Sequence, residues 1–291
     1  MEDKLITYGG QALIEGVLMR GMKNCAVAMR APDGSIVTKV KPLNGIYKSK
    51  LAKIPFLRGL IMLWDSLGLG LFALTDSANL QSGEEEKLEG PALYLTLGIT
   101  FLVAIVIFFL IPAGVGWLTE HFLNWNAWWG NLVEGVLRLF MLVGYIWVIG
   151  FMPDIARVFA YHGAEHKTIN AYEAGADMTP ASVAKFPLAH TRCGTAFLLT
   201  LVVLSLFFFT LLGPLSLAWR LISRVLLIPV LVGISYEYLR WTANNINNPF
   251  VRFIVKPNLA LQSLTTRQPD EKILEVAIAA FQAMRQAENT G

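Results

Sequence analysis

Two histidines and a glutamate lie in one short segment near the middle of the chain. His162 and His166 are four residues apart, and Glu165 lies between them. On a helix, residues at i and i+4 project from the same side, so two imidazoles can bind one metal ion. The order His-x-x-Glu-His contains the groups of the zinc proteases in reverse. The pattern therefore predicts His162 and His166 as metal ligands and Glu165 as the general base.

His190 and Cys193 supply two further donors later in the chain. With the two earlier histidines they would complete a set of three imidazoles and one thiolate, which suits tetrahedral Zn²⁺ or another divalent transition metal. A closed shell of four ligands is structural, whereas a catalytic ion keeps one position for water and lowers the pKa of that water to about 7. The sequence leaves both readings open. It also leaves open a third, in which the histidines only form hydrogen bonds at the polar ends of a helical bundle.

Three more charged residues are candidates for the same site. Glu237, near the end of an apolar segment, is either a metal ligand or general base, or the ion-pair partner of Arg240 or Arg192. Glu173 returns to the His162 side of the helix about 10 Å beyond His166, which suits a group that contacts the ligands or the substrate. Arg192 would hold an anionic substrate group or a lipid phosphate, and the lipid is the favoured reading.

The composition is that of a membrane protein. Of the 291 residues, 55% are apolar and 15% are charged, against about 25% charged in soluble domains. The net charge of +3 and the lack of a basic stripe argue against a nucleic-acid partner. Cys25 and Cys193 lie far apart in the sequence, which fits a reducing compartment better than a disulfide framework.

Four segments have the apolar length that a bilayer core needs, about 20 residues. They are approximately 92–112, 131–152, 194–213 and 219–239. The segment 55–79 is also apolar, but it carries charges, so we predict an amphipathic helix on the membrane or on the membrane domain. An acidic linker follows this helix, up to residue 90. The predicted fold is therefore a mainly α membrane protein, with a four-helix transmembrane bundle over residues 91–240.

The distribution of Lys and Arg gives the orientation. These residues concentrate in 1–90, 153–193 and 240–291, and none lies in the aromatic loop 113–130. Both termini and the candidate metal site are therefore expected on the cytoplasmic side of a bacterial inner membrane.

Several polar residues of the bundle have simpler interpretations. His121, in the aromatic loop, is expected to be an interfacial residue. Glu134 and Arg138 are expected to form a structural pair. Arg220 and Arg224 lie at the outer end of the fourth span. They are exceptions to the concentration of Lys and Arg on the expected cytoplasmic side.

Both polar ends have predicted structure of their own. Residues 1–54 form the β-containing region, with a hairpin of 25–31 and 35–41 around a Pro-Asp-Gly turn. The glycine-rich segment Gly9–Gly21 is either a ligand-binding loop or plain turn geometry. A helix over 153–175 would carry the metal site. The tail 241–291 would hold an amphipathic helix that starts near Asp270.

Four motifs together resemble the bacterial YqhQ-like family of membrane proteins. They are Gly9–Gly21, Tyr161-His-Gly-Ala-Glu-His-Lys167, His190-Thr-Arg-Cys-Gly-Thr195 and Leu264-Thr-Thr-Arg-Gln-Pro-Asp270. Members of this family have no established function and are often described as predicted metal-dependent enzymes. The resemblance spans nearly the whole chain and implies the same site: His162, Glu165, His166, His190 and Cys193.

These observations favour a multi-pass membrane protein with a cytoplasm-facing metal site, acting as a hydrolase on a membrane-proximal peptide or lipid. One alternative is a non-enzymatic scaffold whose polar cluster is structural and whose β region binds a cytosolic protein. The other is an oligomeric channel or transporter. A homo-oligomer is compatible with each of the three.

Overall fold

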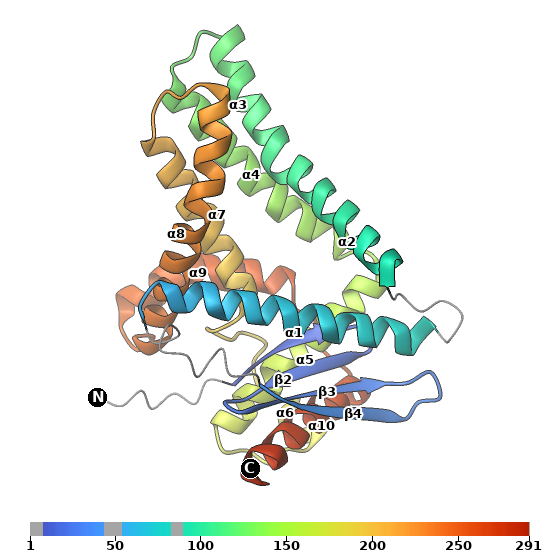
Figure 1. Ribbon diagram of the computed structural model, residues 1–291. Coiled ribbons are helices and arrows are strands. Elements are labelled where there is room, and N and C mark those ends of the chain that lie inside the picture. Colours follow the sequence, from blue (N-terminus) through green and yellow to red (C-terminus); the bar gives the residue numbers. More distant parts are fainter. Residues whose placement is uncertain (1–7, 44–53, 83–89, 291) are drawn as a thin grey trace.

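The computed structural model describes residues 8–43, 54–82 and 90–290 of the chain. Most of the predicted acidic linker lies outside these residues. A bundle of long apolar helices forms one end of the molecule, and a small layered domain built on a β-sheet forms the other (Figure 1). The amino-terminal region, the middle of the chain and the last helix all contribute to this layered domain.

Four antiparallel strands form the sheet in sequence order: β1 (Gly9–Leu13), β2 (Gly16–Arg20), β3 (Asn24–Arg30) and β4 (Ile36–Pro42). The predicted hairpin is confirmed as β3–β4. The glycine-rich segment forms a second hairpin, β1–β2, whose tight turn holds Glu15 at a φ of 53°. Of the two interpretations that the sequence allows for this segment, the structure agrees with plain turn geometry, because the segment forms two paired strands.

Alternation along β2 and β3 divides the core between the two faces of the sheet. Leu18 and Val27 are paired across the strands and pack with Ala73 of α1 (Leu57–Ser82). Their neighbours Val17 and Met19 point to the other face, because successive strand residues alternate in direction. That second face packs on α5 (Pro153–Glu173) and α10 (Glu271–Thr290).

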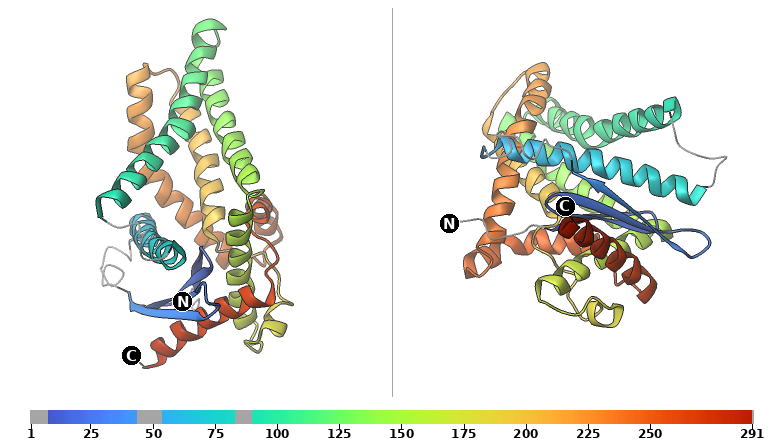
Figure 2. Two further views of the ribbon diagram at one scale, coloured as in Figure 1. Left: turned by 90° about the vertical axis from the view of Figure 1, so that its right-hand side faces the viewer. Right: turned by 60° about the horizontal axis from the view of Figure 1, so that its bottom comes forward.

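Helix α1 lies over the sheet and runs across the lower end of the bundle (Figures 1 and 2). The amide of Gln11 donates to the Ser66 carbonyl at 2.9 Å, and Lys39 binds Asp76 at 2.7 Å. Trp64 is 75% exposed on the side away from these contacts. This packing is consistent with the amphipathic helix that the sequence predicts for 55–79.

The bundle contains a long helical segment and three further helices. The segment begins with α2 (Gly90–Ile105), continues through a π-helical turn, η3 (Val106–Leu110), and ends with α3 (Ile111–Phe122). The others are α4 (Ala127–Ile149), α7 (Gly194–Leu211) and α8 (Leu217–Asn244). Among the described residues, five helical segments are long and apolar enough to cross a membrane: these four and α1. The predicted count of four spans is therefore not confirmed.

Two boundaries differ from those predicted. The first apolar segment continues as helix to Phe122, and α4 begins at Ala127, so most of the expected aromatic loop 113–130 is helical. The tail also contains an unpredicted helix, α9 (Pro249–Leu264), before the expected α10. An internal proline, Pro257, obscured the periodicity of α9 in the sequence.

Buried charges connect the bundle helices near the end opposite the sheet. Glu134 accepts hydrogen bonds from Arg138 at 2.8 Å and from Arg224 at 2.8 Å, and Arg220 pairs with Glu120 of α3. The predicted Glu134–Arg138 pair is thus confirmed as part of a larger network. This network explains why two arginines at this end ran against the charge trend, because both are buried and paired within the protein.

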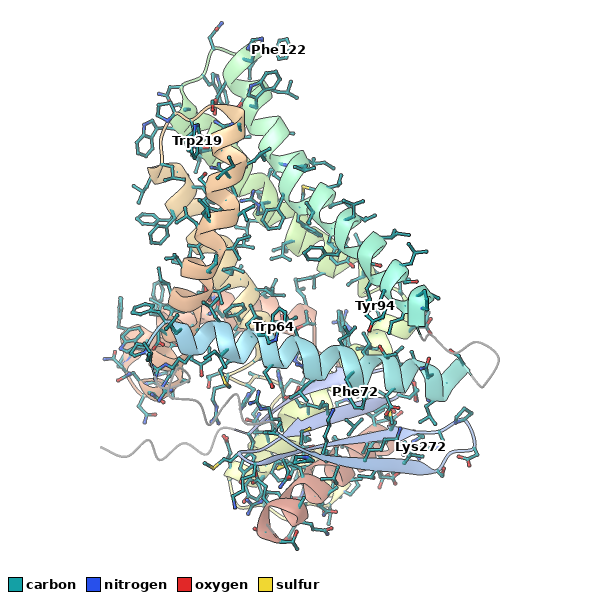
Figure 3. The ribbon with its side chains drawn as sticks, viewed as in Figure 1. Trp64, Phe72, Tyr94, Phe122, Trp219 and Lys272 are labelled. Carbon is teal, nitrogen blue, oxygen red and sulfur yellow. The ribbon has the colours of Figure 1, made fainter. Side chains whose placement is uncertain are left out.

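Aromatic side chains surround the same end of the bundle. Phe122 and Trp219 lie there in Figure 3, far from the sheet. The ring of His121 stacks on Trp117 with centroids 5.1 Å apart. An interfacial role for His121 agrees with this setting.

Candidate metal centre

The two histidines of the central motif are carried by α5. Pro153 occupies the first turn of this helix, where a missing N–H costs nothing, and Gly175 follows its end with a φ of 71°. The helix places His162 and His166 side by side, with ring centroids 4.4 Å apart. The predicted helix over 153–175 and the pairing of its histidines are both confirmed.

Backbone carbonyls orient both imidazoles in the same way. The Nδ1 atom of His162 lies 2.9 Å from the Thr265 carbonyl oxygen, and Nδ1 of His166 lies 2.6 Å from the Leu188 carbonyl oxygen. A carbonyl can only accept, so the Nδ1 atom of each ring carries a proton, and an imidazole that binds a metal ion would do so through the lone pair on Nε2. Metal-binding histidines characteristically donate their second nitrogen to an oxygen in this way.

Cys193 completes the cluster from the start of α7, where it is the residue that caps the helix. Its Sγ lies 3.1 Å from Nε2 of His162 and 3.1 Å from the hydroxyl of Thr195. Ligand atoms of His162, His166 and Cys193 all lie within 4.8 Å of one another. No other group of three such residues this close occurs in the part of the chain that the structure describes.

These donors fit a borderline-soft divalent ion. Cys193 is buried, and Nε2 of His166 is buried with no hydrogen-bond partner among the described residues. A buried nitrogen without a partner destabilises the fold unless its lone pair accepts a hydrogen bond or binds a metal ion. Two imidazoles and a thiolate are the donors that Zn²⁺ prefers. The His162 ring is only half-buried, so it forms the open side of the cluster.

His190 lies next to this cluster but outside the close set of three. Its ring centroid is 5.4 Å from that of His166, and its Nε2 is buried without a partner within the described ranges. Burial, helped by the neighbouring His166, lowers the pKa of His190 to about 3, so the ring is neutral. Gln262 holds its backbone in place, accepting from the His190 N–H at 2.9 Å and donating to its carbonyl at 2.7 Å.

Glu165 lies against the first strand of the sheet. Its side chain lies against Gly10, where an added Cβ would be 2.9 Å from the glutamate Cγ, and the Gly10 N–H donates to the carboxyl. Burial raises the pKa of Glu165 to about 7, and the hydrogen bond from the Gly10 N–H only partly offsets this rise. The glycine-rich hairpin therefore contributes to the site by enclosing this carboxyl group. The assignment of Glu165 as general base stays a prediction.

The three remaining candidates are engaged in ion pairs. Glu237 accepts from Arg58 Nε at 2.7 Å and from the N–H of Phe56 at 3.1 Å, which ties α8 to the start of α1. Its partner is thus neither of the two arginines expected from the sequence. Glu173 and Arg192 pair with each other. Among described residues, none of the three belongs to the set of close metal-binding donors.

Four groups that orient the site were not predicted: the Thr265 and Leu188 carbonyls, the Gln262 side chain and the Gly10 N–H. A backbone carbonyl leaves no mark in a sequence. A signal did exist at Gly163, a glycine in the middle of a helix, which costs about 1 kcal/mol relative to alanine. A Cβ at this position would collide with the Arg267 carbonyl oxygen. Gly163 thus allows the segment that contains Thr265 to pack directly on α5.

Comparison with known proteins gives a family but no activity. Residues 54–287 match the family model described as "Protein of unknown function (DUF1385)". The chain belongs to this family. It is also 36% identical to the Bacillus subtilis (strain 168) "Uncharacterized protein YqhQ" over 296 aligned positions, which cover 97% of this chain and 93% of the relative. The resemblance seen in the sequence motifs is therefore confirmed. No solved structure matches the chain.

Proposed function

We propose that the protein is a metal-dependent membrane protein whose ion is held by His162, His166 and Cys193. The observation that carries this proposal is the shared orientation of the two imidazoles. Each donates through Nδ1 to a backbone carbonyl, so that the Nε2 lone pairs are free for an ion beside the buried thiol. A ligand set fixed in advance in this way loses little conformational entropy when it binds the ion.

Hydrolysis is the chemistry that we propose for this site. Three protein ligands leave the fourth position of a tetrahedral ion for water or substrate, which is the arrangement of catalytic zinc. A bound ion of this kind would act as a Lewis acid and make water more acidic. Glu165, one turn from His162 and with a pKa near neutrality, would take the released proton.

The location of the site suggests a substrate at the membrane. Cys193 begins α7, whose apolar length makes it a candidate span. A peptide or lipid emerging from the bilayer would meet the cluster at this end of the bundle. We propose that this end faces the cytoplasm of a bacterial inner membrane, in line with the distribution of Lys and Arg. The exposed outer strand β4 would then be available to a cytosolic partner.

Cobalt substitution tests the ligand set. We expect Co²⁺ bound to the purified protein to give a thiolate-to-metal charge-transfer band, which Cys193→Ser abolishes while some Co²⁺ remains bound. If His190 is not a ligand, we expect His190→Ala to leave the d–d bands of the bound Co²⁺ unchanged. A change in those bands would make His190 the fourth ligand and the site structural. Absence of any charge-transfer band in the wild type would exclude coordination by Cys193.

A second candidate function rests on the 3.1 Å contact between His162 Nε2 and Cys193 Sγ. A thiol, a histidine that accepts its proton and a carbonyl that orients the histidine make up a nucleophilic pair of the kind used in acyl transfer. In this reading the thiol proton moves to His162 and the sulfur attacks the carbonyl carbon of an ester or amide. The bond from that carbon to the leaving alcohol or amine then breaks, the leaving group takes the proton from His162, and a thioester remains on Cys193. Rapid alkylation of Cys193 by iodoacetamide in protein loaded with Zn²⁺ would favour it over the metal site.

A further inference from the structure

Helix α9, which the sequence did not predict, has two different faces. Asn248 caps its start by accepting from the Phe250 N–H at 2.9 Å, and Pro249 occupies the first turn. Val251 and Val255 are buried on the inner side, whereas Phe253 is 66% exposed on the outer side. Phe250, which is 64% exposed, is a second large apolar side chain on the outside of this helix.

The outer face also carries the positive charge of this region. At 100° per residue, Arg252 and Lys256 follow one edge of the exposed side and Phe250 and Phe253 follow the other. All four are exposed, and the Lys256 ammonium lies 5.7 Å from the Phe253 ring centroid. From residue 238 to residue 269 the sequence contains four basic residues and no acidic one. Aromatic and basic side chains side by side are typical of helices that lie in the headgroup region of a bilayer.

Two contacts fix α9 against helices that are candidate spans. The amide of Asn258 donates to the Thr200 hydroxyl of α7 at 3.3 Å, and the Tyr238 hydroxyl of α8 donates to the Ile254 carbonyl at 3.3 Å. Helix α8 ends at Asn244, shortly before α9 begins. Figure 1 shows α9 lying across the lower ends of α7 and α8, at about the level of α1. A rigid helix in this position would meet the surface of the bilayer that the bundle crosses.

We propose that the outer face of α9 is a binding surface for anionic phospholipid headgroups. Arg252 and Lys256 contact the lipid phosphates, and Phe250 and Phe253 enter the boundary between headgroups and acyl chains. Each cation near an anionic surface strengthens binding by about fivefold. The two together give a preference of about tenfold or more for anionic over zwitterionic lipid. The last turn of α9 and the residue after it also hold His190 and His162 in place, so the bound lipid would lie on the element that orients the metal centre.

The test measures lipid binding to the full-length protein in neutral detergent by native mass spectrometry. We expect phosphatidylglycerol to bind at least about tenfold more tightly than phosphatidylcholine with the same acyl chains. The double variant Arg252→Gln/Lys256→Gln should lose this preference. The matched control Lys185→Gln/Lys272→Gln removes the same charge from exposed positions outside α9 and should keep it.

Four results would overturn the proposal. One is equal binding of the two lipids by the wild type, and another is an undiminished preference in the α9 double variant. The third concerns a competing ligand: displacement of phosphatidylglycerol by equimolar inorganic phosphate would make the surface a site for free phosphate.

An additional variant, Phe253→Ser, tests a second copy of the chain as the occupant. If it dissociates an oligomer and leaves the lipid preference unchanged, this face is a protein interface.

Discussion

His162 Nε2 and Cys193 Sγ lie 3.1 Å apart, although a loop and a short helix separate the two residues in the sequence. The contact joins the middle of α5 to the first turn of α7. The Thr265 carbonyl holds the far side of the imidazole, so the segment after α9 takes part as well. Three regions of the chain therefore meet at one imidazole.

Alkylation should report on the thiol directly. In a Cys25→Ala background, Cys193 is the only cysteine. We expect Zn²⁺ to slow its reaction with iodoacetamide at least about tenfold and EDTA to restore the reaction, because a coordinated ion withdraws electron density from the sulfur and shields it from the reagent. The measurement is the rate of mass increase. Equal rates with Zn²⁺ and with EDTA would contradict coordination by Cys193.

Glu165→Gln should change how the stability of metal-free protein depends on pH. The folded-state pKa of about 7 lies above the ordinary value of 4.5. The folded protein therefore holds this proton more tightly than the unfolded chain does. Its stabilising effect is complete below about pH 4.5 and is lost as the pH rises through 7. Thermal melts of wild type and variant at pH 5 and pH 8 measure this.

We expect the variant to gain stability relative to wild type as the pH is raised between these two values. The conservative change Glu165→Asp keeps a titrating carboxyl group and should retain the wild-type pH dependence. Parallel melting profiles for wild type and Glu165→Gln would show that the buried carboxyl does not titrate in this range.

Gln262→Ala should loosen the loop that carries His190. The substitution removes two hydrogen bonds to the His190 backbone and leaves a buried N–H and a buried carbonyl without partners. Each such group costs about 1–3 kcal/mol. We expect a lower melting temperature and faster hydrogen exchange in the loop before Cys193. Ser263→Ala, at the adjacent exposed position, is the control and should be nearly neutral. Unchanged exchange in Gln262→Ala would contradict the positioning role.

Arg138 should stabilise the junction between the π-helical turn η3 and α3. Pro112 has no N–H to donate to the Phe108 carbonyl four residues earlier, and Arg138 Nε donates to that oxygen at 3.0 Å instead. Arg138 also pairs with buried Glu134. We expect Arg138→Gln to destabilise the protein by about 1–3 kcal/mol, because the Phe108 carbonyl loses its donor and Glu134 keeps only Arg224 as a charged partner. Chemical unfolding in detergent measures this loss.

A second substitution separates the two roles of Arg138. Pro112→Ala supplies an N–H in the helix, so the cost of Arg138→Gln should be smaller in that background than in the wild-type chain. Equal costs in both backgrounds would show that the Phe108 contact contributes nothing and that the Glu134 pair accounts for the whole effect.

Local sequence spacing was sufficient to predict the helical half of the site. A separation of four residues places His162 and His166 together on any α-helix, and Pro153 and Gly175 mark the ends of that helix. The strand alternation of 25–31 and 35–41 was equally local. These features depend on residues that are neighbours in the chain, which is the range over which sequence patterns are informative.

The rest of the site depends on contacts between distant segments. Glu237 could be recognised as needing a partner, but nothing in the sequence indicates Arg58, which lies near the other end of the chain. His190 and Cys193 were equivalent candidates until the loop geometry placed the thiol beside His162 and held the imidazole farther away. Backbone carbonyls such as that of Thr265 are the same in every residue, so their part in the site could not be read from side-chain types.

Metal analysis of the purified protein tests the central claim most directly. After exposure to Zn²⁺ and removal of excess ion by gel filtration, we expect about one Zn²⁺ per chain in the wild type and a large loss in His162→Ala. His121→Ala, which removes a histidine at the other end of the bundle, should retain the wild-type content. Equal metal content in wild type and His162→Ala would contradict the site.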